Sequence, residues 1–168
     1  MRRPRPFLNT ILGVVVAAGC SGDPTGPTEP GMSQAWSLTN LTIASCTATP
    51  ETASSAVIGP GGGVLAIGPH RLVVPEGALS KTVTITARTG GQSGNAIKFG
   101  PSGLRFNSRV RLTISVRNCN GWGFFRVPLV VFTDDALKIL ELEPSLLDNQ
   151  NKTVTGWISH FSRYAVAY

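Results

Sequence analysis

Few residues in this chain are of the types that carry out chemistry. It contains three cysteines and two histidines, His70 and His160. A zinc site built from such residues needs a close spacing such as Cys-x-x-Cys, which the sequence lacks, so we expect no metal site. A hydrolase needs a nucleophile with an acid and a base, and the only candidate pair is His160 with Ser162. We therefore expect no cofactor and no catalysis on an external substrate.

The first cysteine, Cys20, closes a segment that is laid out like a secretory signal peptide. Three arginines precede an apolar run over 7–18, which is too short for a spanning helix of about 20 residues. Ala17-Ala18-Gly19-Cys20 resembles the lipobox of bacterial lipoproteins, where a peptidase cuts before the cysteine. The resemblance implies that residues 1–19 are removed and that the Cys20 thiol carries a lipid anchor. An ordinary signal peptide with an unrelated cysteine is the alternative.

This interpretation places the protein in the bacterial cell envelope, with the membrane as one partner. Ser21 follows the cysteine, and by resemblance a residue other than Asp favours the outer membrane in a cell with two membranes. Removal of residues 1–19 leaves 149 residues with 12 basic and 9 acidic side chains, so the net charge is +3 rather than +6. The basic residues are scattered, so we expect no nucleic-acid binding but an envelope protein or polysaccharide as second partner.

Cys46 and Cys119 remain in the exported chain. An oxidising compartment favours a disulfide between two such cysteines. Closing the loop of 73 residues between them would stabilise the fold by about 4 kcal/mol in the chain-entropy model. Two free buried thiols and a metal site are the alternatives, and we expect the disulfide.

Short β-strands must position these groups. Residues 20–35 are rich in Pro, Gly and Thr without apolar periodicity, which predicts a flexible tether. A first strand and a polar connector are expected over 36–56, and a folded domain over 57–168. The clearest strand is 109–117, where every second residue is apolar. Eight or more short strands with frequent Gly and Pro turns predict an all-β fold, a single antiparallel β-sandwich.

Two further polar groups are expected to have structural roles. His70 stands beside a Gly-Pro turn at the start of a strand, which predicts a position on the surface. Asp134 and Asp135 stand in a hairpin turn without further carboxylates nearby in sequence. We expect them to stabilise that turn and not to bind calcium.

Three tryptophans, Trp36, Trp122 and Trp157, leave a sugar-binding alternative open. Exposed indoles that lie side by side would form a platform for carbohydrate, whereas buried ones would pack in the core or at its rim. We expect packing, and the exposure of these side chains distinguishes the two. A carbohydrate-binding lipoprotein is the function that exposed tryptophans would favour.

Three blocks of sequence carry a family likeness. The first is Gly61-Gly62-Gly63-Val64-Leu65 followed by 72–79, the second is 100–106, and the third is 160–164. Together they resemble the ZU-five domain, which is shared by zona-occludens proteins, ankyrins and netrin receptors and also occurs in bacterial surface proteins. The likeness covers about residues 57–168. It implies a β-sandwich that acts as an interaction or structural module, although a fold alone does not fix function.

The same resemblance implies one possible reaction. His-Phe-Ser is a self-cleavage site in some ZU-five proteins. Mapped onto this chain, Ser162 Oγ would attack the carbonyl of Phe161 while His160 acts as general base, and the resulting ester would hydrolyse. The alternative is a final strand in which Phe161 packs, His160 caps a turn or faces solvent, and Ser162 bonds a backbone group. We expect the structural role.

Overall fold

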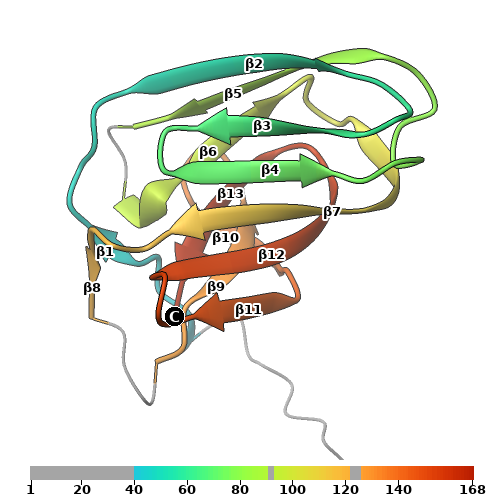
Figure 1. Cartoon of the computed structure of the whole chain (residues 1–168). Helices are drawn as coiled ribbons and strands as arrows, with labels where there is room; N and C mark the ends of the chain where they lie inside the picture. The colour runs from blue at the N-terminus through green and yellow to red at the C-terminus, as the bar shows by residue number, and fades with distance from the viewer. Residues whose placement is uncertain (1–39, 91–92, 122–125) are drawn as a thin grey trace, which may run out of the picture. The chain divides into compact units, whose positions relative to one another are not determined.

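Two antiparallel β-sheets packed face to face, together with a small two-stranded ladder, make up most of the described part of the protein (Figure 1). The computed structural model describes residues 40–90, 93–121 and 126–168. Within these ranges there are thirteen strands, a 3₁₀ turn over Ser93–Asn95 and no α-helix. The expected all-β antiparallel sandwich is therefore confirmed. The signal peptide, Cys20 and the tether expected over 20–35 lie outside the described residues.

The elements follow one another at short intervals along the chain. In order they are β1 (Ser45–Cys46), β2 (Thr52–Ile58), β3 (Gly63–Ile67), β4 (His70–Val74), β5 (Val83–Thr89), η2 (Ser93–Asn95), β6 (Ile97–Gly100), β7 (Arg105–Ser115), β8 (Cys119–Asn120), β9 (Leu129–Thr133), β10 (Ile139–Leu142), β11 (Ser145–Asp148), β12 (Thr153–His160) and β13 (Arg163–Ala167). The strand expected over 109–117 is the second half of β7, and the repeated Gly and Pro turns separate most of the others.

The chain passes repeatedly from one sheet to the other. The six-stranded sheet has the order β10-β9-β13-β6-β5-β2 and the five-stranded sheet the order β11-β12-β7-β4-β3, while β1 pairs only with β8. The links β10–β11 and β12–β13 both cross between the sheets. Glu143 lies in the first of these links, and Phe161 and Ser162 lie in the second. Glu143 and the pair Phe161 and Ser162 therefore all lie where the chain passes from one sheet to the other.

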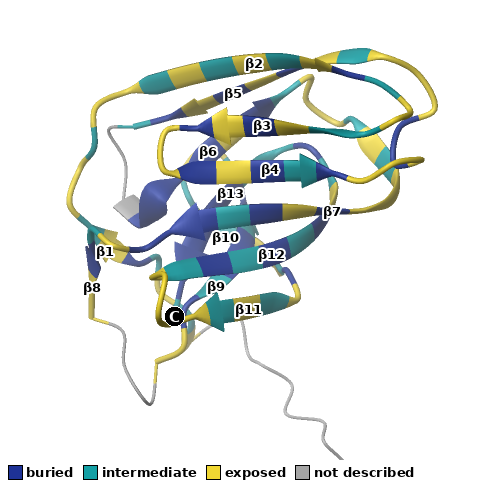
Figure 2. Ribbon diagram, viewed as in Figure 1, coloured by how far each residue is buried: buried dark blue, intermediate teal, exposed yellow. Residues whose placement is uncertain are grey.

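The core lies between the two sheets. On β7 the side chains of Val110, Leu112 and Ile114 are fully buried, whereas Arg109 and Arg111 are exposed. Figure 2 shows the same alternation of buried and less buried residues along β4. Burying one such apolar side chain contributes roughly 1.5–3 kcal/mol. The many side chains that the alternating pattern places between the sheets are therefore the main source of stability.

A second apolar cluster lies on the opposite face of the six-stranded sheet. Its buried members are Ala96, Val131, Ala165 and Ala167, and partly buried side chains including Ile43 cover it. Ile43 forms a β-bridge with Ala167. The segment before β1 therefore protects the outer face of β13, the strand that pairs with both β9 and β6.

The sandwich begins earlier than the boundary expected at residue 57. β2 starts at Thr52, and all seven of its residues pair with β5. The sequence Thr52-Ala53-Ser54-Ser55 resembles a connector because its side chains are small and mostly polar. It forms a strand nevertheless because β2 is the edge of its sheet, where half of the side chains face solvent.

A glycine-rich turn joins β2 to β3 and needs glycine at one position. Gly62 has φ +77, and a Cβ there would lie 2.5 Å from the carbonyl oxygen of Val74. Both the positive φ and the close approach of the backbone exclude a side chain. The Gly-Pro-Gly-Gly-Gly run therefore has the turn role that its composition predicts.

Cys46 and Cys119 face each other across the β1–β8 ladder and form a disulfide. The expected disulfide is confirmed. Beside it, Asn95 Nδ2 donates hydrogen bonds to the carbonyl oxygen of Ser115 and to Asn118 Oδ1, each at 2.7 Å. The amide of Asn118 in turn donates to the carbonyl oxygen of Thr47 at 2.7 Å. The bridge is thus embedded in a network that joins three segments.

None of the described residues forms a helix with the length and apolar character needed to cross a membrane.

Candidate functional site

Three basic side chains stand in a row across the middle of the six-stranded sheet. Arg88 on β5 is the register partner of Lys98 on β6, and Lys98 is the register partner of Arg163 on β13. The flanking residues Phe99 and Tyr164 belong to the core between the sheets. Because successive side chains of a strand point to opposite faces, the row projects from the outer face of this sheet.

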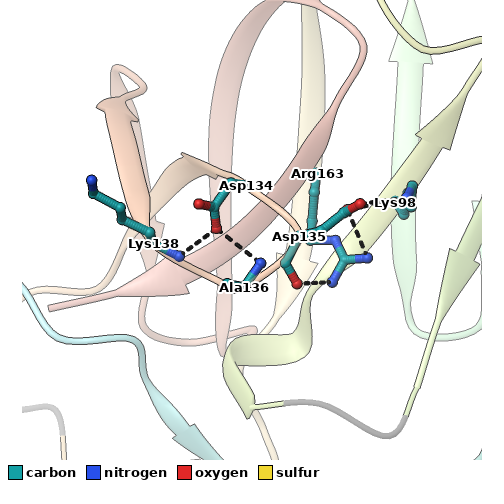
Figure 3. Close-up of polar contacts among 6 residues, drawn as sticks. All are labelled: Lys98, Asp134, Asp135, Ala136, Lys138 and Arg163. Atoms are coloured by element: carbon teal, nitrogen blue, oxygen red, sulfur yellow. Dashed lines mark hydrogen bonds and ion pairs between the residues drawn. The ribbon is translucent and has the colours of Figure 1, made fainter.

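Asp135 forms ion pairs with two members of this row, Lys98 and Arg163, as Figure 3 shows. Its Oδ1 lies 3.0 Å from Lys98 Nζ and 3.1 Å from Arg163 Nη2. The Lys98 hydrogen bond, followed by the positive charges of Lys98 and Arg163, lowers the pKa of the Asp135 carboxyl. Arg88 has no ion pair among the described residues. The row therefore keeps one cation without a fixed counter-charge.

Asp134 stabilises its own turn, whereas the neighbouring Asp135 forms ion pairs with the basic row. Its Oδ1 accepts hydrogen bonds from the backbone N–H groups of Ala136 and Lys138, both at 2.9 Å (Figure 3). These two bonds close the turn between β9 and β10. The expectation of a turn-stabilising aspartate is confirmed for Asp134, whereas Asp135 faces the basic row.

Two open hollows flank Lys98 on this surface. One has a volume of about 360 Å³ and is lined by Arg88, Lys98 and Arg163 together with Glu51 and Thr52, among others. The other has a volume of about 300 Å³, and Asp135 and Ser162 are among the residues that line it. Long basic side chains around an open hollow form an arrangement that suits a charged polymer segment better than an enclosed small molecule.

His160 and Ser162 do not form the pair that self-cleavage requires. The imidazole of His160 has its polar contact with Tyr164 Oη at 3.4 Å and packs edge-on against the Phe132 ring at 5.0 Å between centroids. The structure shows no hydrogen bond from this imidazole to the Ser162 hydroxyl, although both residues are described. The strand ends at His160, so the alternation that would place 160 and 162 on one face is interrupted there.

Phe161 is a core residue, as the structural alternative expects. It is 1% exposed, stacks on Phe99 at 4.9 Å between centroids and meets the Phe106 ring edge-on at 4.8 Å. Its backbone N–H donates to the carbonyl oxygen of Leu104, and its own carbonyl oxygen accepts from the N–H of Gly103. These contacts hold the Phe161–Ser162 link in place without bringing a base to it.

Two glutamates that drew no attention in the sequence lie beside His160. One carboxylate oxygen each of Glu141 and Glu143 and one ring nitrogen of His160 lie within 4.8 Å of one another. Glu143 is only 8% exposed. Burial, followed by the negative charge of Glu141, raises the pKa of Glu143 to about 7, against a smaller opposite effect of Arg109. The sequence signal was Glu141-Leu142-Glu143, which gives no hint of a histidine seventeen positions later.

His70 is buried, so the expected surface position is wrong. It is 2% exposed, and its Nδ1 accepts a hydrogen bond of 3.1 Å from the backbone N–H of Ser115. Burial lowers the pKa of His70 to about 4. The side chain shares the inward face of β4 with Leu72 and Val74. Its role is structural, because an accepted backbone bond in the core needs a neutral imidazole.

The other residues singled out in the sequence are placed only in part. Cys20, Trp36 and Trp122 lie outside the described residues. Trp157 is half-buried on β12, next to Arg111 of β7 across the ladder. The sugar platform therefore stays an untested alternative to the expected packing, and the lipid anchor stays a prediction.

Comparison with models of protein families finds none that matches this chain, and comparison with curated proteins finds no match either. The resemblances to the ZU-five domain and to the lipobox remain predictions that rest on the residues quoted for them.

Proposed function

We propose that this protein is a lipid-anchored component of the bacterial cell envelope whose β-sandwich is a non-catalytic module that binds an acidic envelope polymer. The signal-like segment and the cysteine at its end support the anchor. The cross-strand row of Arg88, Lys98 and Arg163 beside an open hollow is the observation that carries the proposed binding. The ZU-five resemblance agrees with an interaction module but adds nothing on the partner.

The geometry of the row favours a polymer with regularly spaced negative groups. Neighbouring strands lie about 4.8 Å apart, so the three cations follow one another at roughly that interval across the sheet. An anionic group at the first hollow would meet the Arg88 guanidinium, which offers two parallel N–H donors. Asp135 holds Lys98 and Arg163 in place at the far end of the row. Its negative charge also reduces the attraction of that end for an anionic polymer.

The contacts of His160 support a non-catalytic module. Self-cleavage needs a base within hydrogen-bond reach of the Ser162 hydroxyl, and the imidazole instead contacts Tyr164 and Phe132. The other described histidine, His70, is buried and accepts a hydrogen bond from the backbone N–H of Ser115. We therefore rank binding above self-processing.

Metabolic labelling with a radioactive fatty acid tests the anchor. We expect label on the native full-length protein and none on the Cys20→Ala variant, because the thiol is the acceptor of the first lipid. The Ser21→Ala variant serves as the neighbouring control and should keep its label. Unlabelled native protein, or label that persists in Cys20→Ala, would contradict the proposed anchor.

Retention on an acidic polysaccharide tests the basic row. We expect the full chain to bind immobilised polygalacturonate at low salt, and Arg88→Glu to weaken binding roughly tenfold, because it turns an attraction into a repulsion. Arg71→Glu changes charge equally on the exposed face of the other sheet and should have little effect. Equal losses in both variants, or equal retention on neutral dextran, would show that the row is not the site.

A further inference from the structure

Two glutamates and a histidine lie close together near the two links that cross between the sheets. Glu143 lies in the link from β10 to β11, and His160 ends β12 just before the link to β13. Glu141 on β10 is the register partner of Phe132 on β9, which in turn is the register partner of Tyr164 on β13. This row puts Glu141 on the same side of the six-stranded sheet as the core residue Tyr164.

Glu143 is a buried carboxylate that lacks a partner. It is 8% exposed, and no hydrogen bond or ion pair reaches its side-chain oxygens from any described residue. Its backbone is held firmly, because its N–H donates to the carbonyl oxygen of Val130 at 3.0 Å and its carbonyl oxygen accepts from Ser145 Oγ at 2.7 Å. A largely buried carboxylate without a hydrogen-bond donor is costly, and Glu141 adds a second negative charge beside it, against a smaller opposite effect of Arg109.

Tyr164 holds His160 in a form that is ready to bind a cation. The Tyr164 hydroxyl donates its proton to the carbonyl oxygen of His160 at 2.6 Å. The 3.4 Å contact between the same hydroxyl and Nδ1 is then best made by an Nδ1–H group, so we assign the proton to Nδ1. The lone pair is left on Nε2. A second hydrogen bond that fixes the tautomer is the usual companion of a metal-binding imidazole.

We propose that Glu141, Glu143 and His160 bind one divalent first-row transition ion, with Zn²⁺ as the representative case. Two carboxylate oxygens and one imidazole nitrogen suit such an ion, whereas Ca²⁺ and Mg²⁺ prefer all-oxygen sets. In a tetrahedral zinc site the donors lie about 3.3 Å apart, at zinc distances of about 2.0–2.1 Å. The present group spans up to 4.8 Å, so its donors approach one another by roughly 1.5 Å on binding.

The side chains allow this contraction. Glu141 is exposed, so its carboxylate is free to swing toward the ion, whereas Glu143 and His160 are held by the backbone and by Tyr164. Three protein ligands leave the fourth position to water or to a group of a partner. The cation would also add positive charge beside Glu141 and Glu143, where Arg109 opposes their negative charge only to a smaller extent. This inference does not depend on the basic row, which lies on the opposite face of the six-stranded sheet.

Titration of the untagged full chain with ZnCl₂, after removal of bound metal with a chelator, tests the site. We expect one Zn²⁺ per chain with a dissociation constant below about 100 µM, and a rise in Tm of roughly 5 °C or more at saturation. Glu143→Gln and His160→Gln should each weaken binding roughly tenfold or more, since each removes one ligand. Glu76→Gln removes an exposed charge elsewhere and should bind like the native protein.

Each outcome decides the proposal. Glu143→Gln keeps the shape and removes the buried charge, so its metal-free Tm should equal or exceed that of the native chain. If His160→Gln does not fold, Glu141→Gln, which alters an exposed side chain, takes its place. Absence of zinc binding, binding that survives both Glu143→Gln and Glu141→Gln, or tighter binding of Ca²⁺ than of Zn²⁺ would overturn the site.

Discussion

Removal of the Cys46–Cys119 disulfide is expected to lower the free energy of unfolding by about 4 kcal/mol. The bridge closes a loop of 73 residues, which removes a large part of the freedom of the unfolded chain. In the folded state β1 and β8 pair over only two residues each, and hydrogen bonds between Thr47 and Asn118 extend this contact. These hydrogen bonds do not restrain the unfolded chain, so they do not replace the effect of the disulfide on it.

The measurement is urea unfolding of the native full chain and of a Cys46→Ala, Cys119→Ala double variant. Alanine avoids a free thiol, and Cys119 is 7% exposed, so a polar replacement would add its own cost. Ser45→Ala, an exposed neighbour on β1, controls for changes in the ladder alone. A loss below about 1 kcal/mol in the double variant would mean that the bridge is dispensable, contrary to the chain-entropy argument.

Acidification from pH 7 to pH 4 is expected to cost the domain about 3 kcal/mol through His70 alone. Burial lowers the pKa of His70 to about 4 from 6.5. At pH values between these two pKa values, the His70 imidazole is protonated in the unfolded chain and neutral in the folded chain. Stability is therefore fully present above pH 6.5 and falls as the pH is lowered toward 4. Protonation of Nδ1 would also cancel the bond that it accepts from the Ser115 N–H.

The matched variant is His70→Asn, whose side-chain oxygen can accept the Ser115 N–H but does not titrate. Unfolding free energies of both proteins are measured at pH 7 and pH 4, and the carboxylates common to both cancel in the difference. We expect the native protein to lose about 3 kcal/mol more than His70→Asn over this range. Equal losses in the two proteins would show that His70 becomes protonated in the folded state without penalty.

The sequence predicts the strands of this fold better than the environment of its polar residues. The alternation in β7 and the glycine-rich turn at Gly62 suffice for an antiparallel sandwich, because period and turn chemistry are local. β2 was missed because an edge strand needs few apolar residues. His70 was misplaced although the signal was present: Leu72 and Val74 follow it at steps of two, which puts all three on the inward face of β4.

The candidate sites depend on pairing that no local pattern contains. Arg88, Lys98 and Arg163 become neighbours only through the register of β5, β6 and β13. Glu143 and His160 meet because two different links cross between the sheets at neighbouring places. By contrast, the disulfide was predictable because the expected export, with two cysteines left after Cys20, gives each of them one partner.

The way in which the N-terminal segment joins the sandwich determines how the domain responds to a pulling force. Three backbone hydrogen bonds join Thr42 and Ala44 to Val166 and Tyr168, at 2.8–3.1 Å. A force applied through the residues before Thr42 would peel these bonds one after another and then reach Cys46, where a covalent bond stops the peeling. Beyond that point the load passes through Cys119 to the end of β7. Under force the segment would thus extend by a few residues and then stop at the disulfide. Reduction of the disulfide would let the separation of the chain continue into β2.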